Sequence, residues 1–237
     1  MQIRNGLQLG FVLAILAVAV VQPVSASVVG HLTFAECPGD GVTVSLGLID
    51  FLPPLGSTGC IAAGAATSVT FSGGSIAPAE LGTVNDLVAP PTPGQNTGFI
   101  MFTGVFFDLV GIGPGSSNTN CAALAVNGVC SVVAGSPFLL ELVNNALGQP
   151  ATSLALSVNG FARDGTSANS VWSGAFTTQI AGLTPAQIQQ TILNGGSVTS
   201  SFSFDGIATA TPEPVSMALI GGGLIALSFW KKRKSRA

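Results

Sequence analysis

The sequence predicts an all-β fold, either a β-sandwich or a jelly-roll-like domain, with one short helix. Runs of β-branched and aromatic residues recur through residues 27–210, and clusters of Pro, Gly and Asn separate them. Short runs bounded by turn residues are typical of strands, and several in succession are typical of sandwiches. Apolar segments at 1–26 and 211–237 flank this region. We therefore divide the chain into three parts at these boundaries.

The first 26 residues have the layout of a secretory signal peptide. Arg4 stands in a short leading region, an apolar core follows over 7–21, and small residues occupy 24–26. Signal peptidase cleaves after small residues in this arrangement. A retained membrane anchor is the alternative, but a core of about 15 residues is shorter than the roughly 20 that span a bilayer. We therefore expect cleavage after Ala26 and export of the rest.

The central part is acidic and almost without cations. Between Ser27 and Pro214 the chain has one basic residue, Arg163, against all ten acidic residues, a formal charge of −9 with His31 neutral. A polypeptide with a single cation cannot neutralise a phosphate backbone. We therefore exclude nucleic acid as a partner.

Several runs in the central part have the composition of strands. They are residues 28–34, 41–51, 66–74, 98–113, 137–143, 152–164, 169–180 and 196–210. In the last run Val198, Ser200, Phe202 and Phe204 share one face, while other serines, Thr199 and Asp205 occupy the other, as in a strand with one buried face. Between these runs lie Pro-, Gly- and Asn-rich segments of the kind that turns require.

Residues 183–196 are expected to contain the helix. Thr184 suits the N-cap, and Pro185 suits the first helical position. Gln187 completes a capping box with Thr184, and Gly195 or Gly196 ends the helix.

The four cysteines are expected to form disulfides, because exported proteins mature in an oxidising compartment. More than one pairing is open to four cysteines. Proximity along the chain favours Cys37 with Cys60 and Cys121 with Cys130. Neither pair has the close CxxC spacing of a zinc site, so we predict no metal site.

The central part lacks the residue patterns of a catalytic site. His31 is the sole histidine, so a Ser-His-Asp triad would depend on it, and no GxSxG motif accompanies it. The carboxylates are scattered without a pairing pattern, which favours solvated loop positions over a glycosidase pair. We therefore expect no catalytic residue and no cofactor, and we predict that the protein is not an enzyme.

A carbohydrate-binding module or an exported hydrolase is the alternative function for this domain. Carbohydrate modules expose aromatic platforms, yet the chain has no tyrosine and only two tryptophans, Trp172 and Trp230. Trp172 is therefore the strong stacking candidate, and its burial in a core would count against carbohydrate binding.

The C-terminal segment combines three features in order. Pro212, Glu213 and Pro214 come first, then the uncharged run 215–230, and then a basic cluster. The cluster consists of Lys231, Lys232, Arg233, Lys234 and Arg236. A helix over 215–230 would rise about 24 Å, and snorkelling lysines and local thinning let it span a somewhat thicker bilayer. The positive-inside rule keeps the basic end in the cytoplasm and the body outside.

This ordered trio resembles the PEP-CTERM sorting segment of Gram-negative bacteria. The resemblance is confined to the tail, from Thr211 to Arg236, and does not extend to residues 27–210. It implies that an exosortase, an integral-membrane transpeptidase-like enzyme, recognises Pro212, Glu213 and Pro214 and processes the tail. It also implies association with exopolysaccharide or biofilm matrix, where members of that family are often found.

These expectations together describe an exported protein with a non-catalytic β-rich passenger. The precursor is expected in the inner membrane with its body in the periplasm, and the processed form at the cell surface or outside the cell. The expected partners are signal peptidase and exosortase during export, and the inner membrane at least transiently. Exopolysaccharide is a further candidate partner.

Overall fold

The strands of this protein form one large antiparallel sheet that closes on itself. The structure is a computed structural model that describes residues 28–51, 58–88, 97–166 and 170–210. Within these ranges the chain is mostly strand, with one short helix, α2 (Pro185–Leu193). The strands of the closed sheet are β1 (Gly30–Glu36), β4 (Thr58–Ala63), β7 (Leu81–Asn85), β9 (Ile100–Phe102), β10 (Val105–Ile112), β13 (Pro150–Arg163), β14 (Ser170–Ala181) and β16 (Ser203–Ala210).

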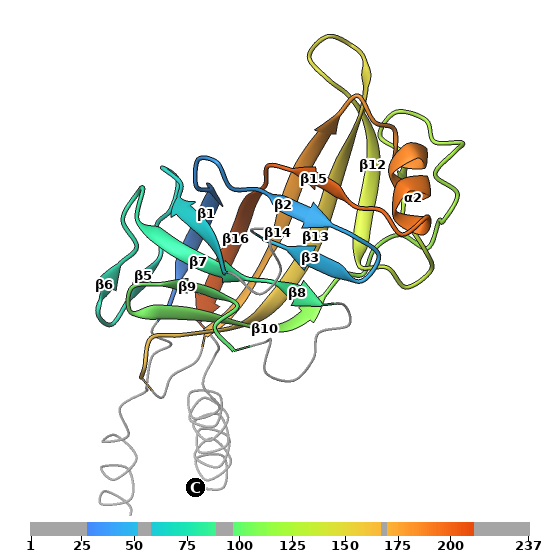
Figure 1. Cartoon of the computed structure of the whole chain (residues 1–237). Coiled ribbons are helices and arrows are strands. Elements are labelled where there is room, and N and C mark those ends of the chain that lie inside the picture. The colour runs from blue at the N-terminus through green and yellow to red at the C-terminus, as the bar shows by residue number, and fades with distance from the viewer. Residues whose placement is uncertain (1–27, 52–57, 89–96, 167–169, 211–237) are drawn as a thin grey trace, which may run out of the picture. The chain divides into compact units, whose positions relative to one another are not determined.

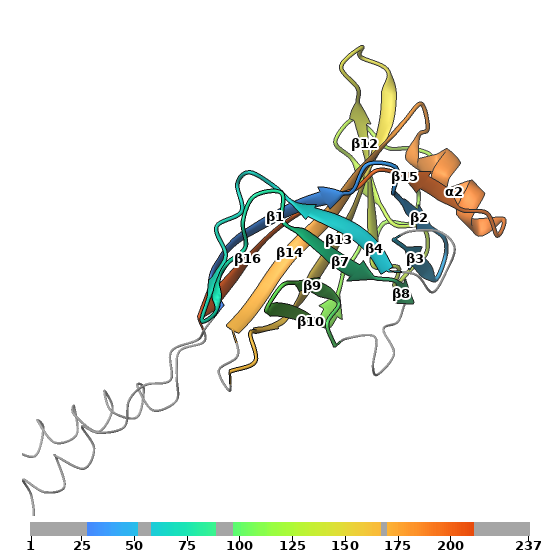
Figure 2. The same ribbon diagram turned by 60° about the vertical axis from the view of Figure 1, so that its left-hand side comes forward.

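Closure makes an eight-stranded barrel. The strands are hydrogen-bonded in the order β10-β9-β7-β4-β1-β16-β14-β13, and β13 then pairs with β10. The length of β13 permits this, because its first half pairs with β12 (Phe138–Asn144) and its second half pairs with β10. Figure 1 and Figure 2 show β13 and β14 running side by side through the structure. The prediction of an all-β chain with one short helix is confirmed, whereas the prediction of a sandwich or jelly roll is wrong.

Two strands that the sequence did not reveal explain that error. β4 and β7 lie between β1 and β9, so the barrel cannot close without them. Their sequences, TGCIAA and LGTVN, are rich in Gly, Ala and Thr and lack the aromatic residues that marked the other runs. Burial alternates along β4, as expected for a strand with one buried face.

The remaining strands form smaller additions to the barrel. β11 (Val129–Cys130) extends the large sheet beyond β12. A second sheet contains β2 (Val42–Val44), β3 (Leu48–Asp50), β8 (Leu87–Val88) and β15 (Val198–Ser200), and β5 (Thr70–Phe71) pairs with β6 (Gly74–Ser75). The run predicted at 196–210 is therefore divided between two sheets, with Phe202 and Phe204 both buried.

Phenylalanine rings fill the interior of the barrel. Phe176 on β14 lies at the centre, with its ring centroid 4.9 Å from that of Phe204, 5.0 Å from that of Phe51 and 5.8 Å from that of Phe34. Aromatic pairs at these separations add to the stabilisation that comes from burying the rings. A cavity of about 20 Å³ between the second sheet and β12–β14 has room for about one water molecule. The core in this region is therefore packed.

The two ends of the described chain leave the barrel side by side. β1 begins at Gly30, which pairs with Ala208 near the end of β16. β16 is bonded on its other side to β14 as far as Ala210, which pairs with Ser170. Gly30 and Ala210, near the two ends of the described chain, therefore lie at the same end of the barrel.

The helix forms as the sequence predicts. The Thr184 hydroxyl accepts from the Gln187 backbone N–H, and the Gln187 side chain accepts from the Thr184 backbone N–H, which completes the capping box. Gly195, at φ +80°, follows the C-cap Asn194. A left-handed residue just after the last helical turn is a common helix terminator.

We expect Phe176→Ala to destabilise the barrel by about 3–5 kcal/mol, because the substitution leaves a cavity among several rings. Phe161→Ala is the matched control, since Phe161 lies on the outer face of β13 and is 44% exposed. That substitution should cost less than about 1 kcal/mol. Equilibrium urea unfolding of the oxidised protein measures both, and equal losses would contradict the assignment of Phe176 to the centre of the core.

Candidate functional site

The predicted sorting residues lie outside the described residues. This applies to the signal peptide 1–26, to Pro212, Glu213 and Pro214, and to the predicted membrane helix 215–230 with the basic residues that follow it. Among the residues that the structure describes, no helix is long and apolar enough to cross a bilayer. The candidate sites described below therefore belong to the barrel and its loops.

Both disulfides form with the predicted pairing. Cys37 pairs with Cys60 and Cys121 pairs with Cys130, each with a Cα–Cα distance of 5.4 Å. The first joins the end of β1 to β4, where the Cys37 backbone N–H also donates to the Cys60 carbonyl at 3.1 Å. Disulfides of this kind persist in oxidising compartments, which agrees with export.

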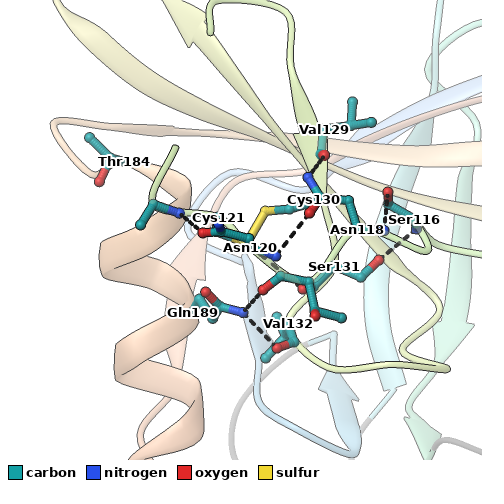
Figure 3. Close-up of a disulfide and its surroundings, with 12 residues drawn as sticks. Ser116, Asn118, Asn120, Cys121, Val129, Cys130, Ser131, Val132, Thr184 and Gln189 are labelled. Carbon is teal, nitrogen blue, oxygen red and sulfur yellow. Dashed lines mark hydrogen bonds between the residues drawn. A yellow bond between two sulfur atoms is a disulfide. The ribbon is translucent and has the colours of Figure 1, made fainter. Parts of the chain in front are cut away.

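The second disulfide holds a long loop against helix α2 (Figure 3). The Gln189 side-chain amide donates to the carbonyls of Thr119 and Val132, at 2.8 and 2.9 Å, one on each side of the disulfide. At the base of the loop the buried Ser131 hydroxyl accepts from the Ser116 N–H at 2.6 Å and donates to the Phe138 carbonyl at 2.7 Å. These contacts fix the loop between β10 and β12.

His31 lies on the outer face of β1, with both ring nitrogens in contact with acceptors. Nδ1 is 3.3 Å from the Ala66 carbonyl, and Nε2 is 3.1 Å from each oxygen of the Asp205 carboxylate. The hydrogen bond to Asp205 is the main cause that raises the pKa of His31, with the Ala66 carbonyl second. Both nitrogens can donate at once only when the ring is protonated, and a protonated imidazole cannot take a proton from a serine hydroxyl. The pair acts here as a link between β1, β16 and a loop.

Asp108 and Arg163 form the other ion pair of the described chain. Arg163 Nε and Nη2 donate to the two carboxylate oxygens of Asp108 at 2.6 and 3.2 Å. These hydrogen bonds raise the pKa of Arg163 further above its usual range. The guanidinium also lies 4.7 Å from the centre of the Phe106 ring. No local pattern of residues indicates this cluster, because strand register alone brings its residues together.

Trp172 is buried in the core, with 3% of its surface exposed. Its ring packs edge-on against Phe107 at 5.8 Å, and its Nε1 donates to the Asp108 carbonyl at 2.9 Å. A tryptophan in this position cannot stack on a sugar. Trp172 is therefore not a candidate for stacking on a carbohydrate.

Many carboxylates accept hydrogen bonds from backbone N–H groups of neighbouring segments. Glu36 accepts from Phe202 at 2.6 Å, and Asp86 accepts from Phe51 at 2.9 Å. Asp164 accepts from Ser72 at 2.8 Å. The expectation of simply solvated loop acids is therefore wrong for these residues, which join segments far apart in the sequence.

One cluster of the described residues has the composition of a metal site. It brings together Cys37, Asp40 and Cys60, whose ligand atoms lie within 4.8 Å of one another. The two sulfurs are joined as a disulfide, so they do not offer the thiolates that zinc requires.

Comparison with known proteins gives no relative for this chain: no family model, curated protein or solved structure matches it. The features above define a disulfide-bonded, closed β-barrel domain. Its function is inferred from its own residues.

We expect the His31–Asp205 pair to make stability depend on pH. The folded-state pKa of His31 is raised above about 6.5, so its stabilisation is fully present below that value and is lost as pH rises through the folded pKa. The stability difference between wild type and Asp205→Asn should therefore shrink as the pH rises from about 6 into the alkaline range. Urea unfolding across this range measures it. Asp164→Asn is the control, and a constant difference for Asp205→Asn would contradict the assignment.

We expect loss of either disulfide to destabilise the barrel through the unfolded chain, which becomes less constrained. Cys37→Ser/Cys60→Ser opens a loop of 23 residues and should cost about 3.4 kcal/mol. Cys121→Ser/Cys130→Ser opens a loop of 9 residues and should cost slightly less, about 2.5 kcal/mol. Thermal unfolding of the two double variants, compared with wild type, tests this order.

Proposed function

We propose that this protein is an exported, exosortase-sorted surface or extracellular-matrix protein whose passenger is a non-catalytic β-barrel. One observation carries the proposal, the order of features along the chain. The sequence begins with a predicted signal peptide and ends with Pro212–Glu213–Pro214, an uncharged run and a basic cluster. In this proposal the run 215–230 stops transfer in the inner membrane. The tripeptide is then presented to the enzyme outside.

The barrel is suited to survive removal of the tail. Ala210, the last residue of β16, pairs with Ser170, and the tripeptide begins two positions later. Among the described residues, the last strand is β16, which ends at Ala210. Cleavage at or beyond Pro212 would therefore leave the strands, the core and both disulfides intact. A domain delivered outside the cell would need this property.

The chemistry of the barrel supports a passenger without catalysis. His31 has both ring nitrogens engaged, and Asp108 is paired with Arg163. Glu36 and Asp86 are used as backbone acceptors. A hydrolase needs a base or a pair of acids free to act on a substrate.

Sorting is tested with Glu213→Ala in a host that has an exosortase, with Glu141→Ala as the matched control. We expect wild type and Glu141→Ala to lose residues 1–26 and the tail and to leave the inner membrane. Glu213→Ala should lose only residues 1–26 and stay membrane-bound, because the tripeptide is no longer recognised. Intact mass and fractionation measure both events. Retention of the tail by wild type would contradict the proposal.

A further inference from the structure

A shallow groove crosses the outer face of β4, β7 and β9. Its volume is about 450 Å³, and most of it is open to solvent. Leu81 and Met101 supply its apolar surface, while Thr58, Thr83 and Thr103 place hydroxyls along it. Leu81 is 64% exposed, so this apolar surface faces solvent.

The threonine hydroxyls of the groove are available to a ligand. None of these three hydroxyls has a hydrogen-bond partner among the described residues, whereas Thr33, Thr67 and Thr152 elsewhere in the barrel are bonded within the protein. A surface that combines unused hydroxyls with exposed aliphatic groups offers both hydrogen bonds and dispersion contacts. This combination matches a sugar ring, which has apolar C–H faces and a hydroxylated edge.

The surface continues from the groove across the point where the barrel closes. Cys60 pairs with Thr83, Thr83 with Met101, Met101 with Phe106, and Phe106 with Arg163. Directly paired residues in adjacent strands point to the same face and lie about 5 Å apart, so this outward row of five extends about 19 Å. Phe106 is partly exposed, and the Arg163 guanidinium covers one face of its ring at 4.7 Å from the ring centre. The row therefore extends the apolar surface beyond the groove, at a spacing similar to the length of one pyranose unit.

The charges around the row exclude an anionic ligand. Arg163 at one end is already neutralised by Asp108, and Asp40 lies beside the Cys37–Cys60 disulfide at the other end. Cys60, in that disulfide, does not titrate. A polyanion would find no available cation along the row and would meet the negative charge of the domain.

The sheet also excludes a peptide that binds as an added strand. β4 is bonded to β1 and β7, β7 to β4 and β9, and β9 to β7 and β10. Strand addition needs an exposed sheet edge with free N–H and C=O groups. Recognition on this face must therefore use side chains.

From these observations we propose that the groove binds a neutral polysaccharide, which lies across β4, β7 and β9 and continues over Phe106. This inference deepens the proposed function and rests on it for one point, that sorting brings the barrel to the outside of the cell, where such polymers occur. The proposed site does not include Trp172, the stacking candidate from the sequence, which is in the core. The binding surface lies instead on strands β4 and β7, which the sequence did not reveal.

The test is native affinity electrophoresis of the full, oxidised chain in non-ionic detergent. Separate gels contain dextran, laminarin or galactomannan as neutral probes, and alginate as the anionic probe. We expect at least one neutral probe to retard the protein and alginate to have no effect. If no neutral probe retards the chain, or if alginate retards it more strongly, the proposal is overturned.

Variants locate the binding surface. Thr58→Val/Thr83→Val removes two hydroxyls while keeping β-branched side chains, and it should weaken binding about tenfold. Leu81→Asp adds a charge at an exposed position and should weaken binding by at least as much. Thr209→Val, on β16 and outside the groove, should bind as wild type does. Unchanged binding in both groove variants, with folding verified by circular dichroism, would refute the proposal.

The result is independent of the sorting experiment, because electrophoresis uses the purified chain whether or not its tail is removed. A chain that binds dextran but keeps its tail in the host would contradict the sorting proposal and support polysaccharide binding by the groove. A chain that is sorted but is retarded by no neutral probe would contradict polysaccharide binding by the groove and leave the sorting proposal intact.

Discussion

The closed barrel depends on the pairing of β10 with the second half of β13. Three features converge on Asp108 at this contact. Its carboxylate binds Arg163, its carbonyl accepts from the Trp172 indole, and Gly160 faces that carbonyl with no side chain. A Cβ at Gly160 would overlap the carbonyl oxygen, so only glycine lets the strands approach there. Because a closed sheet has no edge between these strands, it also avoids the edge-to-edge association to which open sheets are prone.

The distribution of charge follows from the same architecture. The barrel has very few cations, so most of its carboxylates cannot be neutralised by ion pairs. Glu36, Asp86 and Asp164 instead accept from backbone N–H groups of loops and short strands. Charge-assisted hydrogen bonds of this kind are stronger than neutral ones. They hold the second sheet and the β5–β6 hairpin on the barrel without enlarging the hydrophobic core.

Closure also separates the parts of the proposed function. The two ends of the described chain lie at one end of the barrel, next to the paired residues Gly30 and Ala208. The groove with Leu81 and Thr83 lies instead on the outer face of β4, β7 and β9. In the proposed function, recognition by an exosortase uses the tail, and contact with a polymer uses the outer wall of the barrel. Neither requires the packed interior to open.

Local sequence determined those features of this protein that depend on neighbouring residues. The capping box at Thr184, the aromatic strands and the pairing of nearby cysteines follow from propensity, side-chain geometry and short loops. Tertiary structure decided the rest. β4 and β7 contain Gly, Ala and Asn, which are depleted in strands, and they are strands because β1 and β9 bond them on either side. Barrel closure, the Asp108–Arg163 pair and the groove depend on register between distant segments, which no local pattern of residues specifies.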